Sequence, residues 1–339
     1  MPTRAQHPIW QALLTCLLLT CFLSAQGIVE PRTGALLLRE TDLAVPAGAV
    51  DLTVERALQP NLGEAGLLGA AWRLNWESTE GRLAERDHGN GNVVRPRYGA
   101  DGKLARVEGP KGAALSFVYS PDGRLASIVS SSGARVDYTF SQGNLTAVGV
   151  NGGPTTKYGY SPEGRLVRVE NPRSGAVEFT YDAQGRVLSR LFADASQERY
   201  EYGDDWFRRT NAAGGATTVQ WSPDGRYDYI TNPLGNRTTI EYDAAGRLLS
   251  ASGPTGILAR YTYDAAGRTL SEEGPGGELT RFEYLGESEL LKTITYPDGM
   301  QEVFDYDAQR NLIAVRRGAE TTAQLSYYPD GLLRSVQGS

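Results

Sequence analysis

The residue types that most often carry catalysis are scarce in this sequence. Its 339 residues include two histidines, His7 and His88, and two cysteines, Cys16 and Cys21. A base at His88 would fit hydrolysis, but His88 lies in Asp-His-Gly-Asn-Gly, a composition typical of a solvated loop, which is the interpretation we favour. Because catalysis needs a proton shuttle or an activated nucleophile, we predict that the protein is not an enzyme and nominate no catalytic residue.

Carboxylates are plentiful, but they recur at a fixed interval. Paired carboxylates carry out glycoside hydrolysis, yet a catalytic pair occurs once in a chain, whereas a turn residue recurs with its turn. The recurring aspartates are Asp122, Asp182, Asp224, Asp243, Asp264, Asp298 and Asp330. Calcium binding by stacked Asp-Gly turns stays an alternative, although the Gly-Gly-x-Gly-x-Asp nonapeptide is missing. The adjacent pair Asp204 and Asp205 could hold a cation, but we favour a solvated turn. We therefore predict neither a metal nor a cofactor.

Residues 1–25 are typical of a secretory signal peptide. Arg4 gives a positive start, the stretch from Trp10 to Leu23 is almost entirely apolar, and cleavage is expected after Ala25. We predict a protein that is secreted or displayed at the cell surface, with no membrane span in the mature chain. An uncleaved anchor and lipidation at Cys21 stay open as alternatives. Cleavage after Ala25 removes both cysteines, so the mature chain has no disulfide and no zinc site of the usual Cys/His kind.

An aromatic residue returns about every 21 residues along most of the chain. The positions are Tyr98, Tyr119, Phe140, Tyr160, Tyr181, Tyr202, Trp221, Tyr242, Tyr263, Tyr284, Tyr306 and Tyr327. An apolar residue usually stands two positions earlier, as Ile240 does before Tyr242, and a period of two indicates a β-strand with one apolar face. Self-similarity at a fixed period is the signature of a repeat architecture.

The residues after each aromatic position predict a tight hairpin. In Tyr-Asp-Ala-Ala-Gly-Arg-Leu, residues 242–248, the aspartate begins a type I turn, and Gly246 closes it with a positive φ. The register then places Tyr242 opposite Leu248, and it places Asp243 opposite Arg247 as a pair of opposite charges. The same register pairs Tyr119 with Leu125, Tyr160 with Leu166, Tyr181 with Val187, Trp221 with Tyr227 and Tyr306 with Leu312.

These hairpins predict an all-β fold. Residues 96–339 form a long antiparallel meander of about 12 hairpins, which curls into a spiral strip or partial shell because strands twist. Residues 26–95 break the period but still alternate, so we predict a β-rich entry module packed on the first hairpins. The 40 glycines and 17 prolines fit a fold with many turns. The formal charge of −6, with no basic block, argues against nucleic acid as a partner.

The repeated unit resembles the YD repeat of the Rhs family, which is shared by bacterial Rhs proteins, the cocoon-forming subunits of insecticidal toxin complexes, and teneurins. Residues 242–248 match Tyr-Asp-x-x-Gly-Arg-Leu throughout, and Asn-Pro-Leu-Gly-Asn-Arg at 232–237 resembles the linking segment. The stretch from Pro31 to Trp76 resembles the module that precedes the repeats in bacterial members. Its best residues are Gly34, Thr41-Asp42-Leu43, Arg56, and Gly69-Ala70-Ala71-Trp72-Arg73. The resemblance covers nearly the whole mature chain.

The resemblance implies a spiral strip of hairpins that walls a hollow shell. In full-size relatives, which carry more repeats, the shell encloses a toxic C-terminal domain, but we find neither the self-cleaving C-terminal core nor a toxin in this sequence. Our first hypothesis is therefore a secreted, non-enzymatic structural or binding protein that forms part of a β-shell wall. The alternatives are a cargo-sheltering segment of an Rhs-type polymorphic toxin delivery system and a cell-surface glycan-binding module.

These hypotheses differ in the partners that they expect. An unpaired strand at the C-terminal edge of the sheet would seek a second Rhs/YD-repeat chain or another copy of this chain. Rows of tyrosines can stack on sugar rings, so surface glycans are a further candidate partner, although no single tyrosine can be nominated. The sequence leaves a closed ring and an open spiral equally open.

Overall fold

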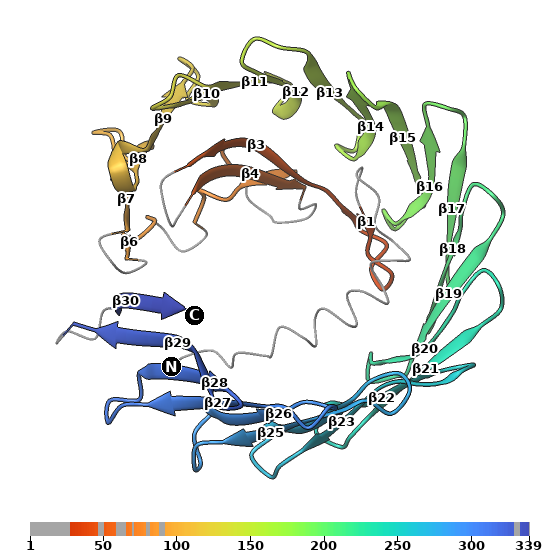
Figure 1. Ribbon diagram of the computed structural model, residues 1–339. Coiled ribbons are helices and arrows are strands. Elements are labelled where there is room, and N and C mark those ends of the chain that lie inside the picture. The colour runs from red at the N-terminus through yellow and green to blue at the C-terminus, as the bar shows by residue number, and fades with distance from the viewer. Residues whose placement is uncertain are drawn as a thin grey trace. The chain divides into compact units, whose positions relative to one another are not determined.

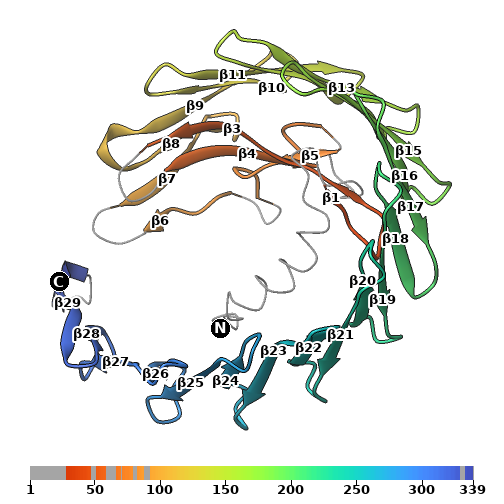
Figure 2. The same cartoon turned by 45° about the vertical axis from the view of Figure 1, so that its right-hand side comes forward.

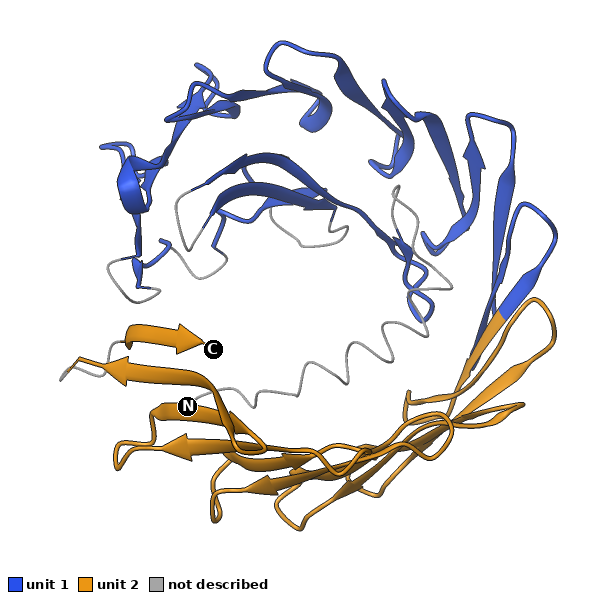
Figure 3. Ribbon diagram, viewed as in Figure 1, with its two compact units in different colours: residues 1–217 blue, residues 218–339 orange. Residues whose placement is uncertain are grey.

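The computed structural model describes most of the chain after the predicted signal peptide. The described residues are 28–46, 51–58, 66–69, 71–78, 82–87, 92–328 and 333–338. The predicted signal peptide with both cysteines, His88 and Asp330 lie outside them. The chain divides into two compact units, residues 1–217 and 218–339 (Figure 3), which are described in turn. No helix among the described residues is long and apolar enough to cross a membrane.

Unit 1 starts with two small sheets. β1 (Ile28–Val29) pairs with β2 (Leu36–Leu37). A three-stranded antiparallel sheet, here called the entry sheet, consists of β3 (Arg39–Val45), β4 (Leu52–Leu58) and β5 (Trp72–Leu74). The residues of β4 alternate between buried and half-buried, as a strand with one fully covered face does. The entry sheet lies on the inner side of the curved row of hairpins of unit 1 (Figures 1 and 2).

The rest of unit 1 is a row of antiparallel strands in which each strand pairs with the next along the chain. The strands are β6 (Arg86–Asp87), β7 (Val93–Tyr98), β8 (Leu104–Glu108), β9 (Ala114–Tyr119), β10 (Leu125–Ser130), β11 (Arg135–Ser141), β12 (Asn144–Val150), β13 (Thr155–Tyr160), β14 (Leu166–Asn171), β15 (Gly175–Tyr181), β16 (Val187–Phe192), β17 (Gln197–Tyr202) and β18 (Trp206–Thr210). A short 3-10 turn, η1 (Pro110–Gly112), joins β8 and β9.

Unit 2 continues the same sequential antiparallel pairing. Its strands are β19 (Ala216–Trp221), which starts at the end of unit 1, β20 (Tyr227–Thr231), β21 (Arg237–Tyr242), β22 (Leu248–Gly253), β23 (Gly256–Tyr263), β24 (Thr269–Glu273), β25 (Leu279–Tyr284), β26 (Leu291–Thr295), β27 (Gln301–Tyr306), β28 (Leu312–Arg317), β29 (Glu320–Tyr327) and β30 (Leu333–Gly338). The all-β antiparallel meander that the sequence predicts is confirmed.

The hairpin register is the predicted one. Tyr242 lies opposite Leu248, and the pairing shifts by one residue at Glu241, so this hairpin carries a β-bulge next to its turn. Gly246 has φ +80° and donates its N–H to the carbonyl of Asp243 at 2.9 Å, which closes the turn. The other predicted pairs, at Tyr119, Tyr160, Tyr181, Trp221 and Tyr306, form in the same register.

The aromatic residues that recur about every 21 residues are called here the ladder residues. The core consists largely of the apolar side chains that stand two positions before them. At this position the side chains of Phe117, Tyr138, Tyr158, Phe179, Tyr200, Val219, Ile240 and Tyr261 are buried. The corresponding Phe282, Phe304 and Leu325, farther along unit 2, are only half-buried. One face of the sheet therefore carries a row of apolar side chains. These side chains are buried up to Tyr261 and half-buried at the three later positions in unit 2.

The entry module touches more of the array than the sequence predicts. We expected it to pack on the first hairpins, where Leu52 indeed lies close to Gly109. Its contacts extend farther, because Gly69 forms a β-bridge with Asn144 and the carbonyl of Gly34 accepts the N–H of Val187 at 3.0 Å. Such backbone bonds depend on how the row of hairpins in unit 1 curves. The alternation of apolar and polar residues within one strand does not determine that curvature.

Candidate functional site

Where a repeat begins its turn with aspartate, that aspartate holds its own hairpin together. In the turn at residues 243–247, one carboxylate oxygen of Asp243 accepts the backbone N–H groups of Ala245 and Arg247, both at 2.9 Å. The other oxygen accepts Nε of Arg247 at 2.5 Å. The backbone N–H of Arg247, together with its guanidinium, holds the pKa of the Asp243 carboxyl below its ordinary value. The aspartate is therefore a turn residue, as predicted, with its acceptor sites in use.

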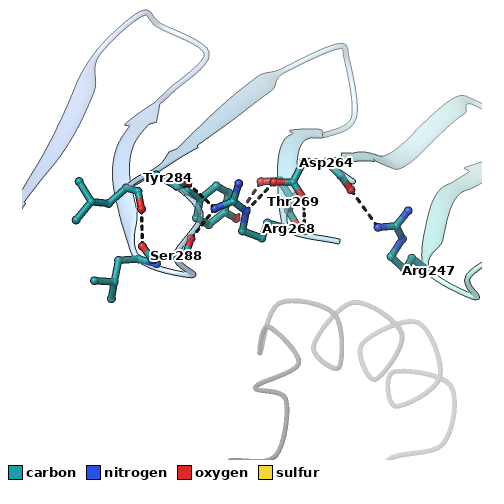
Figure 4. A network of polar contacts seen from close by, with 9 residues as sticks. Arg247, Asp264, Arg268, Thr269, Tyr284 and Ser288 are labelled. Atoms are coloured by element: carbon teal, nitrogen blue, oxygen red, sulfur yellow. Dashed lines mark hydrogen bonds and ion pairs between the residues drawn. The ribbon is translucent and has the colours of Figure 1, made fainter. Parts of the chain in front are cut away.

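The arginine of the same turn reaches the next hairpin. The Arg247 guanidinium lies 4.6 Å from the ring centroid of Tyr263, within the range of a cation–π contact. Its Nη1 also donates to the carbonyl of Asp264 at 3.4 Å. In the following copy, Arg268 lies over Tyr284 and donates to the carbonyls of Gly286 and Ser288 (Figure 4). Arginine therefore links two hairpins as well as pairing with the aspartate of its own turn.

A hydrogen bond from the ladder tyrosine also joins the two hairpins, and it runs from the later hairpin back to the preceding one. The hydroxyl of Tyr263 donates to the carbonyl of Leu248 at 2.8 Å, and Tyr284 donates to Thr269 at 2.9 Å (Figure 4). In each case the acceptor is 15 residues earlier, at the start of the last strand of the preceding hairpin. We call the hydroxyl bond and the cation contact together the interhairpin lock.

Parts of the lock recur in both units. The hydroxyl bond to the carbonyl 15 residues earlier is made by Tyr119, Tyr160, Tyr181, Tyr202, Tyr263, Tyr284, Tyr306 and Tyr327. The cation contact is made by Lys103 to Tyr119, Arg124 to Phe140, Arg165 to Tyr181, Arg186 to Tyr202, Arg226 to Tyr242, Arg247 to Tyr263 and Arg268 to Tyr284. Burial raises the pKa of Tyr119 and of Tyr160 to about 12, so these hydroxyls stay protonated donors at neutral pH.

A charged cluster fastens the entry sheet to the array. Arg56, which is 3% exposed, donates Nε to both carboxylate oxygens of Asp42, at 2.9 and 3.0 Å. Tyr138 of β11 donates its hydroxyl to the same carboxylate at 3.0 Å. The Arg56 guanidinium lies 4.8 Å from the ring of Trp72 and 5.2 Å from that of Tyr158. The cluster thus joins strands β3, β4 and β5 to β11 and β13, the first strands of two consecutive hairpins.

Burial dominates the electrostatics of this cluster. It raises the pKa of Asp42, and the adjacent Arg56 charge and the two side-chain hydrogen bonds only partly oppose this effect. Trp72 extends the contact, because its indole N–H donates to the hydroxyl of Tyr160 at 3.0 Å, and Tyr160 donates in turn to the carbonyl of Leu145 at 2.7 Å. Since Arg56 and Tyr138 already bind the carboxylate of Asp42, the cluster is suited to holding the entry sheet and not to proton transfer.

Two family models match this chain. The Teneurin YD-shell model matches residues 78–212, and the RHS Repeat model matches residues 242–279 and 263–299. The chain therefore contains YD/RHS repeats. No curated protein matches its sequence.

Solved structures of TcdB2-TccC3 and of a Tc holotoxin pore resemble this chain. The crystal structure of TcdB2-TccC3 has 18% sequence identity and a TM-score of 0.47, and the match covers 88% of this chain. The Tc holotoxin pore of Photorhabdus luminescens gives the same identity and TM-score, with 89% of this chain covered. The match covers 16% of each of those chains, so the YD-repeat chain spans about a sixth of their length.

The described part of the YD repeats does not gather the carboxylates singled out in the sequence into a metal-binding group. Among the described residues, no group of three or more His, Cys, Asp or Glu side chains is placed to hold a metal ion. Asp122 and Asp224 each bind the serine that begins their turn, and Asp204 and Asp205 lie in the bend between β17 and β18. A shallow open depression in unit 1, lined by Lys157, Arg168, Glu170 and neighbouring residues, has no such group beside it.

The lock is the feature that reasoning from the sequence missed. Pairing within a hairpin predicts that Tyr242 faces Leu248, but it does not predict which atoms of the preceding hairpin a tyrosine hydroxyl reaches. In the copies with a Gly-Arg turn, the constant interval of 15 residues between the residue after Gly-Arg and the next aromatic residue of the series was a usable signal. The lock also engages the hydroxyl and a ring face of Tyr263, which are the groups that a stacked sugar would need. Glycan binding by the ladder stays a prediction.

Proposed function

We propose that the mature chain, residues 26–339, is a secreted, non-enzymatic wall segment of a YD-repeat shell. The observation that carries this proposal is the interhairpin lock. Tyrosine, aspartate, glycine and arginine, the four residues that define the repeat, are each used to close a hairpin or to join it to the next, as in the copy from Asp243 to Tyr263. The division into a signal peptide at 1–25, an entry module at 26–95 and an array at 96–339 belongs to this proposal.

Two measurements on the exported protein test the wall proposal. Mass spectrometry of the protein secreted by its host should give the mass of residues 26–339. Small-angle scattering of that product should give a radius of gyration well above about 20 Å, the value for a compact globular domain of this length, because a wall has no filled centre. A value near 20 Å would contradict the wall. A product that keeps residues 1–25 would contradict the signal peptide alone.

The apolar row of unit 2 favours a second candidate function, the sheltering of an unfolded polypeptide. Phe282, Phe304 and Leu325 continue the row that is buried up to Tyr261, yet they are only half-buried. Removing apolar surface of this kind from water favours binding of an extended apolar chain. The proposal is limited to an unfolded, apolar chain and does not extend to a toxin domain.

A protease-protection assay tests the sheltering function. Reduced casein, incubated with the full chain and then with trypsin, should be cut more slowly than casein alone. Leu325→Asp should abolish this protection, because it places a charge on the apolar row. Gln324→Asp is the matched control, since it adds the same charge at an exposed position on the opposite face of β29. Equal protection by the two variants would contradict the sheltering role and leave the wall proposal intact.

A further inference from the structure

Opposite each residue of the apolar row lies one residue of the other strand of the same hairpin. In unit 2 these opposite residues are Ile230, Ala251, Glu272, Ile294, Val315 and Val336. All of them except Glu272 are apolar. Glu272, which lies opposite Tyr261, therefore places a carboxylate on a face of the sheet that is otherwise formed by apolar side chains at these positions.

Unit 1 also carries charges at such positions, and there the sheet itself neutralises them. Arg190 lies opposite Phe179 and is 1% exposed. Its Nε donates to Oε2 of Glu198 at 3.0 Å, and Arg209 binds the other carboxylate oxygen of the same residue. A charge on this face is stable where an opposite charge reaches it, because a desolvated charge without a counterion is costly.

Glu272 has no such counterion among the described residues. Its carboxylate accepts the hydroxyl of Tyr261 at 3.2 Å, and the residue opposite it on β25 is Thr280. Arg260, on the adjoining strand β23, lies on the other face of the sheet, where it pairs with Glu273 at 3.0 Å. The half-buried carboxylate of Glu272 can therefore accept a cation from another molecule.

We propose that Glu272 binds a lysine or arginine side chain of the sheltered polypeptide, an inference that rests on the proposed sheltering function and names the class of chain that unit 2 accepts. The carboxylate lies on β24, between the strands that carry the buried Tyr261 and the half-buried Phe282. The aliphatic stem of a basic side chain can lie on the apolar row while its charged end reaches the carboxylate. A basic residue within an apolar stretch is therefore preferred to an entirely apolar stretch.

The register of the two strands also gives the spacing of the preferred residues. Glu272 lies opposite Thr280, and Phe282 stands two residues farther along β25, on the same face of the sheet. Such diagonal neighbours are roughly 7–8 Å apart. An extended chain rises about 3.4 Å per residue and points every second side chain to the same side. A basic residue and an apolar residue two positions apart would therefore meet Glu272 and Phe282 together.

Fluorescence anisotropy with labelled peptides tests the role of Glu272 in the full chain. One probe is an unstructured peptide that repeats Lys-Ser-Phe, and the other is the same peptide with every lysine acetylated. We expect the full chain to bind the lysine peptide roughly fivefold more tightly, as for one ion pair, and to lose this preference at high salt. Glu272→Gln should bind both peptides as weakly as the wild type binds the acetylated one.

Glu273→Gln is the matched control, since it removes the same charge from the next residue, on the other face of the sheet. It should keep the preference for the lysine peptide, which separates a contact at Glu272 from general attraction to a negatively charged chain. Equal binding of the two peptides by the wild type, or loss of the preference in both variants or in neither, would overturn the role of Glu272 and leave the sheltering function intact. Failure of both peptides to bind would instead contradict the sheltering function, and this inference with it.

Discussion

The hydroxyl of Tyr263 donates a hydrogen bond at 2.8 Å to the carbonyl of Leu248, which lies 15 residues earlier and in the preceding hairpin. Arg247, the residue before Leu248, lies over the ring of the same tyrosine. The two contacts run in opposite directions between the hairpins, so the β21–β22 hairpin is tied to the next one by its own arginine and by its neighbour's tyrosine.

Removing that hydroxyl should weaken the contact between these two hairpins by a measurable amount. We expect Tyr263→Phe to lower the free energy of unfolding by about 1 kcal/mol, the usual net value of one intramolecular hydrogen bond. The midpoint of guanidinium unfolding measures this loss. Tyr328→Phe is the control, because Tyr328 is 50% exposed and lies outside the ladder. Equal midpoints for the two variants would show that the bond does not hold the hairpins together.

The turn glycine should resist substitution for conformational reasons alone. At Gly246, with φ +80°, an added Cβ would have its nearest neighbour at 3.6 Å, so space is not the obstacle. A left-handed conformation costs an ordinary L-residue about 1–2 kcal/mol, and Gly246→Val should lose at least that much because a β-branched residue adopts it poorly. Thermal unfolding measures the loss. Gly274→Ala, at a glycine without positive φ, should change the melting temperature little, and an unchanged value for Gly246→Val would refute the turn geometry.

The buried pair in the entry cluster should be costly to break on one side. Arg56→Met leaves the Asp42 carboxylate buried without its cation, and we expect a loss of about 3–5 kcal/mol. The double variant Asp42→Leu with Arg56→Met removes both charges and should recover a large part of that stability. Denaturant unfolding of the wild type, both single variants and the double variant measures the coupling. A double variant that is less stable than Arg56→Met would contradict the pairing.

Alkaline pH should open the array by ionising its tyrosines. Burial raises the pKa of Tyr119 and Tyr160 to about 12, above the unfolded value of about 10. The folded state therefore binds these protons more tightly than the unfolded state does, and its stability is complete below pH of about 10 and falls as pH rises toward about 12. The ultraviolet absorbance of tyrosinate, followed with circular dichroism, should show ionisation and loss of β-structure together. Free ionisation near pH 10 in a chain that stays folded would contradict this prediction.

The structure confirms those sequence predictions that depend on one hairpin. The register of Tyr242 with Leu248, the pair of Asp243 with Arg247 and the positive φ of Gly246 follow from strand alternation and turn chemistry, which act over a few residues. Contacts between hairpins depend on how far each one is rotated and shifted against the last. The bond from Tyr263 to Leu248 and the contact of Arg247 with Tyr263 therefore lay beyond single-hairpin reasoning.

The entry cluster illustrates a second limit of reasoning from the sequence. Asp42, Arg56 and Trp72 were recognisable as residues of the module that precedes the repeats, but nothing in their spacing identified their common partners. Those partners, Tyr138 and Tyr158, lie in the third and fourth hairpins of the array and are ordinary members of its apolar row. A position that looks periodic can thus carry a particular role, because one other segment of the chain folds back onto it.

The 15-residue reach of the tyrosine bond also bears on how such arrays can change in length during evolution. Each bond and each arginine contact joins a hairpin only to its immediate neighbour. A duplicated segment of about 21 residues would therefore bring its own tyrosine and arginine and would find acceptors on both sides without further substitutions. A deletion of one such segment would rejoin two compatible surfaces in the same way. Lengthening or shortening by whole hairpins is consequently a small mutational step, whereas an insertion of a few residues in a strand would displace the tyrosine hydroxyl of that hairpin from its carbonyl.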